Sequence, residues 1–309
     1  MDNHNELIAQ WMRSAVENHF SEQELKQRTL DFIEFKKTEG FSFGQLTKVH
    51  YEMFGGLQHE DINQACAAVE TMILALDIFD DLQDQDATDK PWCSSGQAIS
   101  MNIATGILML SLKMMEDSSF DRKWDAIRYI NHQVLKAVQG QHLDLQQKMQ
   151  NEEDYVKMAH DKSGSLMACA CLVGVALATP DYHDAVKEYA TNFGIAAQIQ
   201  NDIQDVLRGD MKNDLLYKKQ TLPILKLLEE NHEQANLARD YYKGKVEPYF
   251  MYENKIKLLD WIRSSSSITY VQVLKRVYQR KAIQQIEELD TIAKNTKKRQ
   301  KLLNLIEQL

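Results

Sequence analysis

The chain has 309 residues and a mass of 35.8 kDa, enough to bury a large hydrophobic core without disulfides or metals. Twelve Gly and four Pro are few for this length, which argues against a turn-rich β-sandwich or barrel and leaves no room for a Gly-rich phosphate loop. The formal net charge of −9 makes the chain a poor non-specific binder of nucleic acid, and we expect no nucleic-acid partner.

The N-terminus lacks the basic and apolar regions of a signal peptide, and the four Cys form no CxxC pair. The longest mostly apolar run covers residues 166–178, which is shorter than the roughly 20 residues that span a bilayer. We therefore expect a soluble, cytoplasmic protein with reduced thiols.

Apolar residues recur at helical spacing along the whole chain, and no strand pattern stands out. In chain order we predict helices over residues 6–20 and 21–37, a helix that Gly55-Gly56 closes, and a helix that Asp61 caps and that runs through Phe79 into an acidic cluster. Further helices are predicted over residues 97–116, 121–150, 152–178, 181–207, 222–230, 235–246, 249–263 and 269–309, the last with possible breaks. Residues 86–96 and 264–267 are predicted to be a loop and a linker, and residues 208–219 to be irregular. The fold class is therefore all-α, and we predict a single helical domain over residues 1–309.

Two similar acidic motifs end two strongly apolar helices. The first is FDDLQD at residues 79–84, and the second is QNDIQD at residues 200–205. Each places oxygen ligands at positions i, i+1 and i+4, and residues i and i+4 share one face of a helix. Oxygen ligands without His or Cys suit Mg²⁺, which commonly bridges carboxylates to a substrate phosphate. A pair of solvated acidic helix ends is the alternative, and the repetition of the motif makes it the less favoured one.

Together with the acidic motifs, four further segments resemble the trans-isoprenyl diphosphate synthase family in order and spacing. GQHLDL at residues 140–145 resembles the GQxxDL helix of that family, and KSG at residues 162–164 resembles its K-T/S-G segment. GIAAQ at residues 194–198, leading into the second acidic motif, is similar to G-x-x-FQ, and KQTLP at residues 219–223 is similar to K-x-TLP. The resemblance extends over most of the chain.

The resemblance implies an isoprenoid-synthase helical bundle in which the two acidic motifs face each other and three Mg²⁺ hold an allylic diphosphate. It makes metal ligands of Asp80, Asp81, Asp84, Asn201, Asp202 and Asp205. Lys162 and Lys219 would grip the leaving diphosphate as point charges, and with the first three Asp they form the implied catalytic set. The other residues that the resemblance places against the substrate are Ser163, Gln198, Gln141 and Asp144, with Ala75 and Leu76 facing the prenyl pocket.

The site for the usual acceptor of the family, isopentenyl diphosphate, is not matched. Its basic segment falls on residues 39–44 (EGFSFG), its His on Ile73, and its Arg pair on about Asp89-Lys90. A second diphosphate would therefore lack most of its cationic partners. We expect Phe41 and Phe43 to leave an apolar mouth that suits an uncharged or aromatic acceptor.

This combination resembles the ComQ-type prenyltransferases, which attach a geranyl or farnesyl group to a Trp indole of the ComX pheromone precursor in quorum sensing. The resemblance implies geranyl or farnesyl diphosphate and a short Trp-containing peptide as substrates. The alternatives are a short-chain polyprenyl diphosphate synthase, a terpene cyclase with altered motifs, or a non-catalytic partner subunit of an active synthase. The second motif departs from family and cyclase patterns alike, because Asn201 stands where Asp is usual and Asp205 fills a later cyclase slot.

Two further partners are compatible with the sequence, a second copy of the chain and a membrane surface. The family usually dimerises, so the resemblance allows a homodimer. A basic C-terminal end, which includes Lys294, Lys297, Lys298, Arg299 and Lys301, precedes several Leu and could touch a membrane peripherally. We favour a solvated final helix over that contact.

Overall fold

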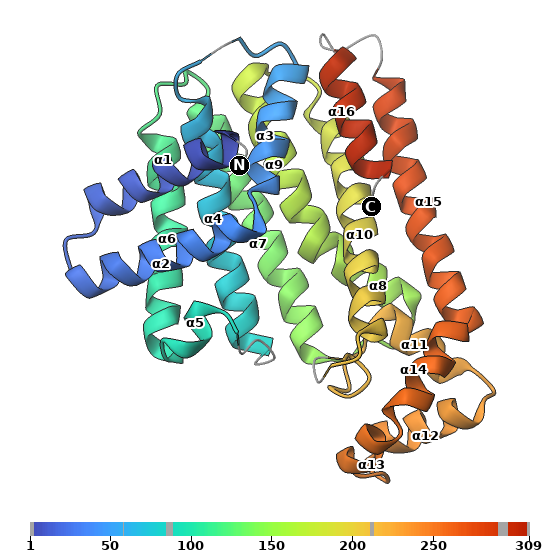
Figure 1. Ribbon diagram of the computed structural model, residues 1–309. Coiled ribbons are helices and arrows are strands. Elements are labelled where there is room, and N and C mark those ends of the chain that lie inside the picture. Colours follow the sequence, from blue (N-terminus) through green and yellow to red (C-terminus); the bar gives the residue numbers. More distant parts are fainter. Residues whose placement is uncertain (1–2, 58, 85–88, 211–212, 290–295, 308–309) are drawn as a thin grey trace. The chain divides into compact units, whose positions relative to one another are not determined.

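The computed structural model describes residues 3–57, 59–84, 89–210, 213–289 and 296–307, and every regular element among them is helical (Figure 1). The all-α prediction is confirmed. In chain order the elements are α1 (Asn3–His19), α2 (Gln23–Glu39), α3 (Ser42–Met53), α4 (Ile62–Asp84), α5 (Pro91–Ser94), α6 (Gln97–Glu116), α7 (Lys123–Gln146), α8 (Glu152–Ala159), the π-helix η1 (His160–Gly164), α9 (Ser165–Ala178), α10 (His183–Leu207), α11 (Leu222–Glu229), α12 (Glu233–Tyr242), α13 (Pro248–Glu253), α14 (Lys255–Ser264), α15 (Ser266–Glu288) and α16 (Thr296–Glu307).

The chain divides into two compact units. Unit 1 comprises Met1–Leu135, Leu166–Ala190 and Gln285–Leu305, and unit 2 comprises Lys136–Ser165, Thr191–Gln284 and Ile306–Leu309. The first acidic motif belongs to unit 1, and the second, with both Lys-containing motifs, belongs to unit 2. We describe each unit by itself, and the single domain over residues 1–309 stays a prediction.

α4 is the central helix of unit 1. Residues 64–75 are all buried, as expected of a helix that is apolar around most of its circumference. α4 contacts α1, α3 and α6, and α1 packs beside α2 (Figure 1). The acidic motif follows directly on this buried stretch, so the core of unit 1 fixes where its carboxylates begin.

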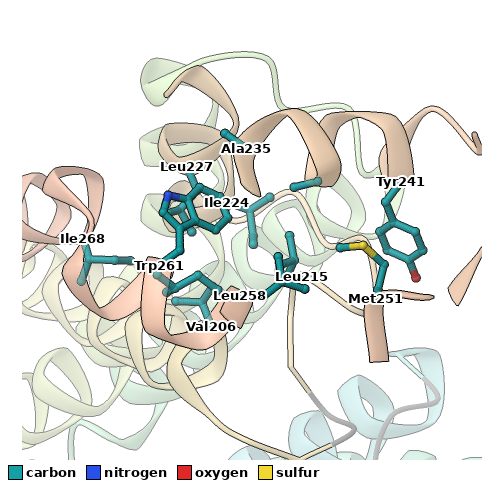
Figure 2. Close-up of a cluster of buried hydrophobic side chains, with 12 residues drawn as sticks. Val206, Leu215, Ile224, Leu227, Ala235, Tyr241, Met251, Leu258, Trp261 and Ile268 are labelled. Carbon is teal, nitrogen blue, oxygen red and sulfur yellow. The ribbon is translucent and has the colours of Figure 1, made fainter. Parts of the chain in front are cut away.

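Two apolar clusters stabilise unit 2. One surrounds Tyr155 with side chains of α8, α10, α11 and α15, among them Ile199 and Ile203. The other joins the end of α10 to helices α11 to α15 through residues such as Leu215, Leu258 and Trp261 (Figure 2). Both clusters include residues in or next to the second acidic motif, namely Ile203 and Val206, and the first also includes Leu222 of the 219–223 motif.

Several predicted connections are helical in the structure. Of the predicted loop 86–96, residues 86–88 lie outside the described residues and Pro91–Ser94 form α5. The linker predicted over 264–267 is wrong, since only Ser265 is non-helical between α14 and α15. The Glu230 carboxylate accepts hydrogen bonds from the Ser265 and Ser267 hydroxyls, which fixes this tight junction.

The helix predicted over 152–178 contains a π-helical turn, η1, between α8 and α9. The helix predicted over 269–309 is divided into α15 and α16, and Lys294 lies outside the described residues. The final helix buries its apolar side within the protein, where Leu302 and Ile306 are fully buried, and its solvated character stays a prediction. Lys298, at the start of α16, forms an ion pair with Glu52 of α3.

Three helices are long and apolar enough to cross a membrane by length and composition alone, namely Ile62–Asp84, Gln97–Glu116 and Glu152–Ala178. The windows in the first and third are mostly buried inside the protein, at 78% and 72%, whereas that of Gln97–Glu116 is 44% buried. Burial against other helices accounts for the apolar character of the first and third.

Candidate active site

The first acidic motif occupies the last two turns of α4 in unit 1. Asp80, Asp81 and Asp84 are partly buried, so the end of this helix presents three carboxylates within five residues. Ala75 is fully buried and Leu76 is half-buried, one turn before Asp80. The predicted ligands of the first cluster and the predicted prenyl-pocket residues therefore lie on successive turns of one rigid helix.

Asp81 is held by two donors from the segment that follows α4. Lys90 Nζ donates to Asp81 Oδ2 at 2.7 Å, and the Trp92 indole N–H donates to the same oxygen at 2.8 Å. Burial raises the pKa of Asp81, although the Lys90 ammonium works in the opposite direction. Lys90, the one cation left where the family has its Arg pair, is thus already bound to a carboxylate of this motif.

Residues 39–44, where the family carries its basic acceptor segment, form the junction between α2 and α3. Phe41 is fully buried in the core, so the prediction that it lines an apolar mouth is wrong; Phe43 is half-buried. The buried Glu70 carboxylate of α4 accepts the Gly44 N–H at 2.6 Å and so satisfies a free amide in the first turn of α3. Burial raises the pKa of Glu70 to about 7.

A cation close to this junction in the chain, Lys36, is also neutralised. Lys36 Nζ lies 2.8 Å from Asp77 Oδ2 and 3.3 Å from Glu39 Oε2. Burial opposes the charged form of Lys36, but Asp77 outweighs it, and the pKa of Lys36 is raised. Ile73, at the position of the family's His, is almost completely buried. The junction therefore offers carboxylates and apolar side chains, and its Lys is committed to ion pairs.

Three glycines bring the motif-bearing helices of unit 2 into close contact. A Cβ at Gly140 of α7 would lie 2.1 Å from the Lys162 backbone nitrogen in η1. A Cβ at Gly194 of α10 would lie 2.6 Å from Gly164 Cα, at the end of η1. Only glycine permits such approaches of backbone to backbone. The π-helix, an element frequent at functional sites, is thus clamped between α7 and α10.

This packing joins four of the predicted substrate-binding residues. Lys162 Nζ forms an ion pair with Asp144 Oδ2 at 2.7 Å, between η1 and α7. The Ser163 hydroxyl donates to Gln198 Oε1, between η1 and α10. Gln141 lies on α7, half-buried and one turn before Asp144. The structure therefore brings Lys162, Asp144, Ser163 and Gln198 together within unit 2.

Asp202 has a different role from its neighbours in the second acidic motif. Its Oδ1 accepts from Gln198 Nε2 at 2.9 Å and its Oδ2 from the Tyr155 hydroxyl at 2.6 Å. Burial raises the pKa of Asp202 to about 7, and the side chain is only 4% exposed. Both oxygens already accept from protein donors, and the role of Asp202 as a metal ligand stays a prediction. Asp202 anchors α10 to α8.

The other two members of that motif are accessible. Asn201 is exposed, and Asp205 is half-buried with its Oδ1 3.2 Å from Arg208. Asn201 and Asp205 are four residues apart and share one face of α10, whereas Asp202, one residue after Asn201, is turned about 100° away from Asn201 and points inward. We retain these two as the ligand candidates of unit 2.

Lys219 is positioned by its backbone. Its N–H donates to the Asp214 carbonyl at 3.0 Å, and its carbonyl accepts from the Tyr242 hydroxyl at 2.8 Å. Asp214 is 3% exposed, and burial raises the pKa of its carboxyl to about 8. The Thr221 hydroxyl donates to Asp214 Oδ2 at 3.1 Å. Asp214 therefore organises the turn that presents Lys219.

Four polar residues with clear roles around the motifs were not predicted: Tyr155, Asp214, Trp92 and Lys36. Tyr155 stands seven residues before Lys162 on an otherwise apolar helical face, a signal that periodicity could have shown. Asp214 and Trp92 lie in segments predicted to be irregular, where the sequence gives no facing partner.

The donor chemistry fits Mg²⁺. The accessible groups at both motifs are carboxylate and amide oxygens, which hard divalent cations prefer. Within the described residues, no group of three or more His, Cys, Asp or Glu side chains is close enough to hold a metal ion without a further ligand. Water and substrate phosphates commonly complete the coordination of Mg²⁺. The residues present therefore suit a cation that arrives with a diphosphate.

Residues 43–259 match the polyprenyl synthetase family. The chain belongs to this family. The match starts in the second residue of α3 and continues into α14, so it includes both acidic motifs and both Lys-containing motifs.

Individual relatives refine this result. Tryptophan prenyltransferase ComQ of Bacillus subtilis (strain 168) is 31% identical over 279 residues, covering 90% of this chain and 92% of the relative. The fold is similar to that of a polyprenyl synthetase from Streptomyces coelicolor A3(2), with a TM-score of 0.80, 18% identity and coverage of 99% and 97% of the two chains. A geranylgeranyl pyrophosphate synthase from Corynebacterium glutamicum, solved with calcium and isoprenyl diphosphate, gives a TM-score of 0.75 at 19% identity, covering 98% and 94%.

Proposed function

We propose that this prenyltransferase transfers a geranyl or farnesyl group from its diphosphate to the indole of a Trp in a ComX-like pheromone precursor peptide. The observation that carries the proposal is the combination of preserved and replaced parts. The segments that resemble the allylic diphosphate site are present, whereas the acceptor segment at residues 39–44 has no cation and is integrated into the core of unit 1. The similarity to a tryptophan prenyltransferase over 90% of the chain supports the same acceptor.

The donor half of the reaction needs charge stabilisation on a departing diphosphate. Asp80, Asp81, Asp84, Asn201 and Asp205 are the residues that would hold Mg²⁺, because they offer the carboxylate and amide oxygens that this cation prefers. Bound Mg²⁺ supplies Lewis-acid stabilisation of the leaving group. The resemblance implies three ions, a number that the donor set is compatible with.

Lys162 and Lys219 add point charges beside the departing diphosphate. Lys162 forms an ion pair with Asp144, and the close packing of α7 and α10 against η1 fixes the backbone of Lys162. When the allylic C–O bond breaks, its electron pair leaves with the diphosphate, and both ammonium groups stabilise that charge. Ala75 and Leu76 offer the prenyl chain an apolar wall without aromatic obstruction.

In the second half of the proposed reaction, the indole of the peptide Trp is the nucleophile. Its C3 attacks the allylic cation and forms the new C–C bond, and the peptide nitrogen of the same Trp then closes a ring on C2. The released diphosphate takes the proton lost in that closure. An indole needs no cationic site, so the committed ion pairs of Lys36 and Lys90 do not hinder its binding.

A homodimer in the cytoplasm is part of the proposal. In unit 1, the large apolar side chains of Met109, Trp124 and Leu135, on α6 and α7, are 60%, 58% and 64% exposed. Exposed apolar side chains that gather on one surface are typical of protein–protein interfaces. Covering them with a second copy explains this exposure. The buried apolar side of α16 argues against the membrane contact that its basic residues suggested.

The test incubates purified protein with farnesyl or geranyl diphosphate, Mg²⁺ and a synthetic peptide that contains one Trp. Mass spectrometry should show one added prenyl group, and the same peptide with Ala in place of Trp should remain unmodified. Prenylation that persists without the Trp would refute the indole acceptor. Failure of every peptide, with efficient elongation of isopentenyl diphosphate, would establish the short-chain synthase alternative.

A further inference from the structure

Trp92 is the most completely enclosed aromatic residue beside the first acidic motif. Its side chain is fully buried, and its ring meets Phe32 at 5.5 Å and Phe35 at 5.4 Å, both edge-on and both from α2. The Ser100 hydroxyl of α6 donates to the Trp92 carbonyl at 2.6 Å. Contacts from two helices therefore fix both the ring and the backbone of Trp92.

The only polar atom of that ring is aimed at the motif. The indole N–H donates to Asp81 Oδ2 at 2.8 Å, and Lys90 donates to the same oxygen at 2.7 Å. Two donors on Oδ2 leave Oδ1 as the oxygen that can meet a cation. An Asp near a helix end ordinarily samples several rotamers, and fixing one of them before the ligand arrives removes that ordering cost.

We infer that Trp92 is a positioning residue, which orients the Asp81 carboxylate so that Oδ1 is presented to the cation bound by the first acidic motif. The inference rests on the proposed metal-assisted function. Lys90 alone could not provide this orientation, because an ammonium on a flexible chain attracts a carboxylate without fixing its angle. The rigid, buried indole supplies the direction. Hydrogen-bond partners of ligating carboxylates typically alter metal affinity about 10- to 100-fold when they are removed.

The chain contains a matched control. Trp261 of α14 is also buried, and its indole N–H donates to Glu230 Oε2 at 2.9 Å. Figure 2 shows its ring among Leu227, Ile224 and Ile268, in the apolar cluster of unit 2. Both indoles thus donate to a carboxylate from an apolar environment, but only Trp92 reaches a residue of an acidic motif.

The experiment replaces each Trp by β-(3-benzothienyl)alanine, which keeps the shape of the ring and puts sulfur in place of N–H. Trp92→Phe and Trp261→Phe serve as encoded versions of the same pair. Mn²⁺ binding in the presence of inorganic diphosphate is followed by electron paramagnetic resonance. Hydrogen exchange of residues 78–84 is measured separately in EDTA, without metal or substrate.

We expect the Trp92 replacement to weaken Mn²⁺ binding about tenfold and to speed exchange at the end of α4, while the Trp261 replacement changes neither. Wild-type Mn²⁺ binding after replacement of Trp92, or an equal loss after replacement of Trp261, would overturn the inference. An Asp80→Ala variant distinguishes failure of the inference about Trp92 from failure of the proposed metal-assisted function. If it loses Mn²⁺ binding while the Trp92 variants do not, the inference alone fails; if it retains binding, the metal-assisted function fails as well.

Discussion

Replacing Gly140 by Ala should disable the enzyme through the backbone of η1. The added Cβ would lie 2.1 Å from the Lys162 nitrogen and 2.5 Å from the Asp161 carbonyl carbon. Ordinary contact begins at 3.4 Å, so α7 and η1 must separate by about 1.3 Å, the difference between 3.4 and 2.1 Å. No rotamer change relieves this clash, because both partners are backbone atoms.

Overpacking of this kind costs about 1–3 kcal/mol or more, and the better helix propensity of Ala returns only about 1 kcal/mol. A displacement of about 1 Å at a positioning element can lower turnover about 10²-fold. Urea unfolding and steady-state prenyl transfer measure the two effects. Gly209→Ala is the control, since its Cβ would meet nothing closer than 3.8 Å. Wild-type stability and turnover in Gly140→Ala would refute the clamp around Lys162.

Three further outcomes are expected. Asp80→Ala, Asp81→Ala and Asp205→Ala should each lower turnover at least about 10²-fold, or about 2.7 kcal/mol, and EDTA should abolish it; an active enzyme in EDTA would contradict the metal clamp. Asn201→Asp should stay active across a magnesium titration, because an anionic oxygen replaces the amide oxygen at nearly equal volume; a folded but inactive variant would reveal a specific need for the amide. Because burial raises the pKa of Asp214 to about 8, its contribution to stability is present below its unfolded pKa and is lost as the pH rises through about 8. The unfolding free energy should therefore fall between about pH 4 and 8 and level off above about pH 8, and Asp214→Asn should flatten that fall; parallel curves would exclude Asp214 as its source.

Much of the helical architecture could be predicted because the apolar periodicity persists over long segments. α6 begins and ends at its predicted residues, and α10 ends at its predicted last residue, Leu207. The π-turn η1 could not be predicted, since it depends on the close approach of Gly140 and Gly194 from other helices. Similarly, residues 264–267 look like a Ser-rich linker until Glu230 supplies the acceptor for their hydroxyl groups.

The acidic motifs could be recognised from the sequence, but only the structure shows which of their side chains are exposed and which are buried. A one-residue difference along α10 separates the exposed Asn201 from the buried Asp202, whose partner Tyr155 lies 47 residues away in the chain. Phe41 illustrates the opposite error. An aromatic residue in a segment expected to line a mouth is instead part of the core, because α3 starts immediately after it.

The central claim is that the acceptor is an indole and not a second diphosphate. The most direct measurement offers equal concentrations of a Trp-containing precursor peptide and labelled isopentenyl diphosphate to the enzyme with farnesyl diphosphate and Mg²⁺, and quantifies both products by mass spectrometry. We predict prenylated peptide, modified at its Trp, and no elongated diphosphate. Elongated diphosphate as the main product, with the peptide unmodified, would contradict the account.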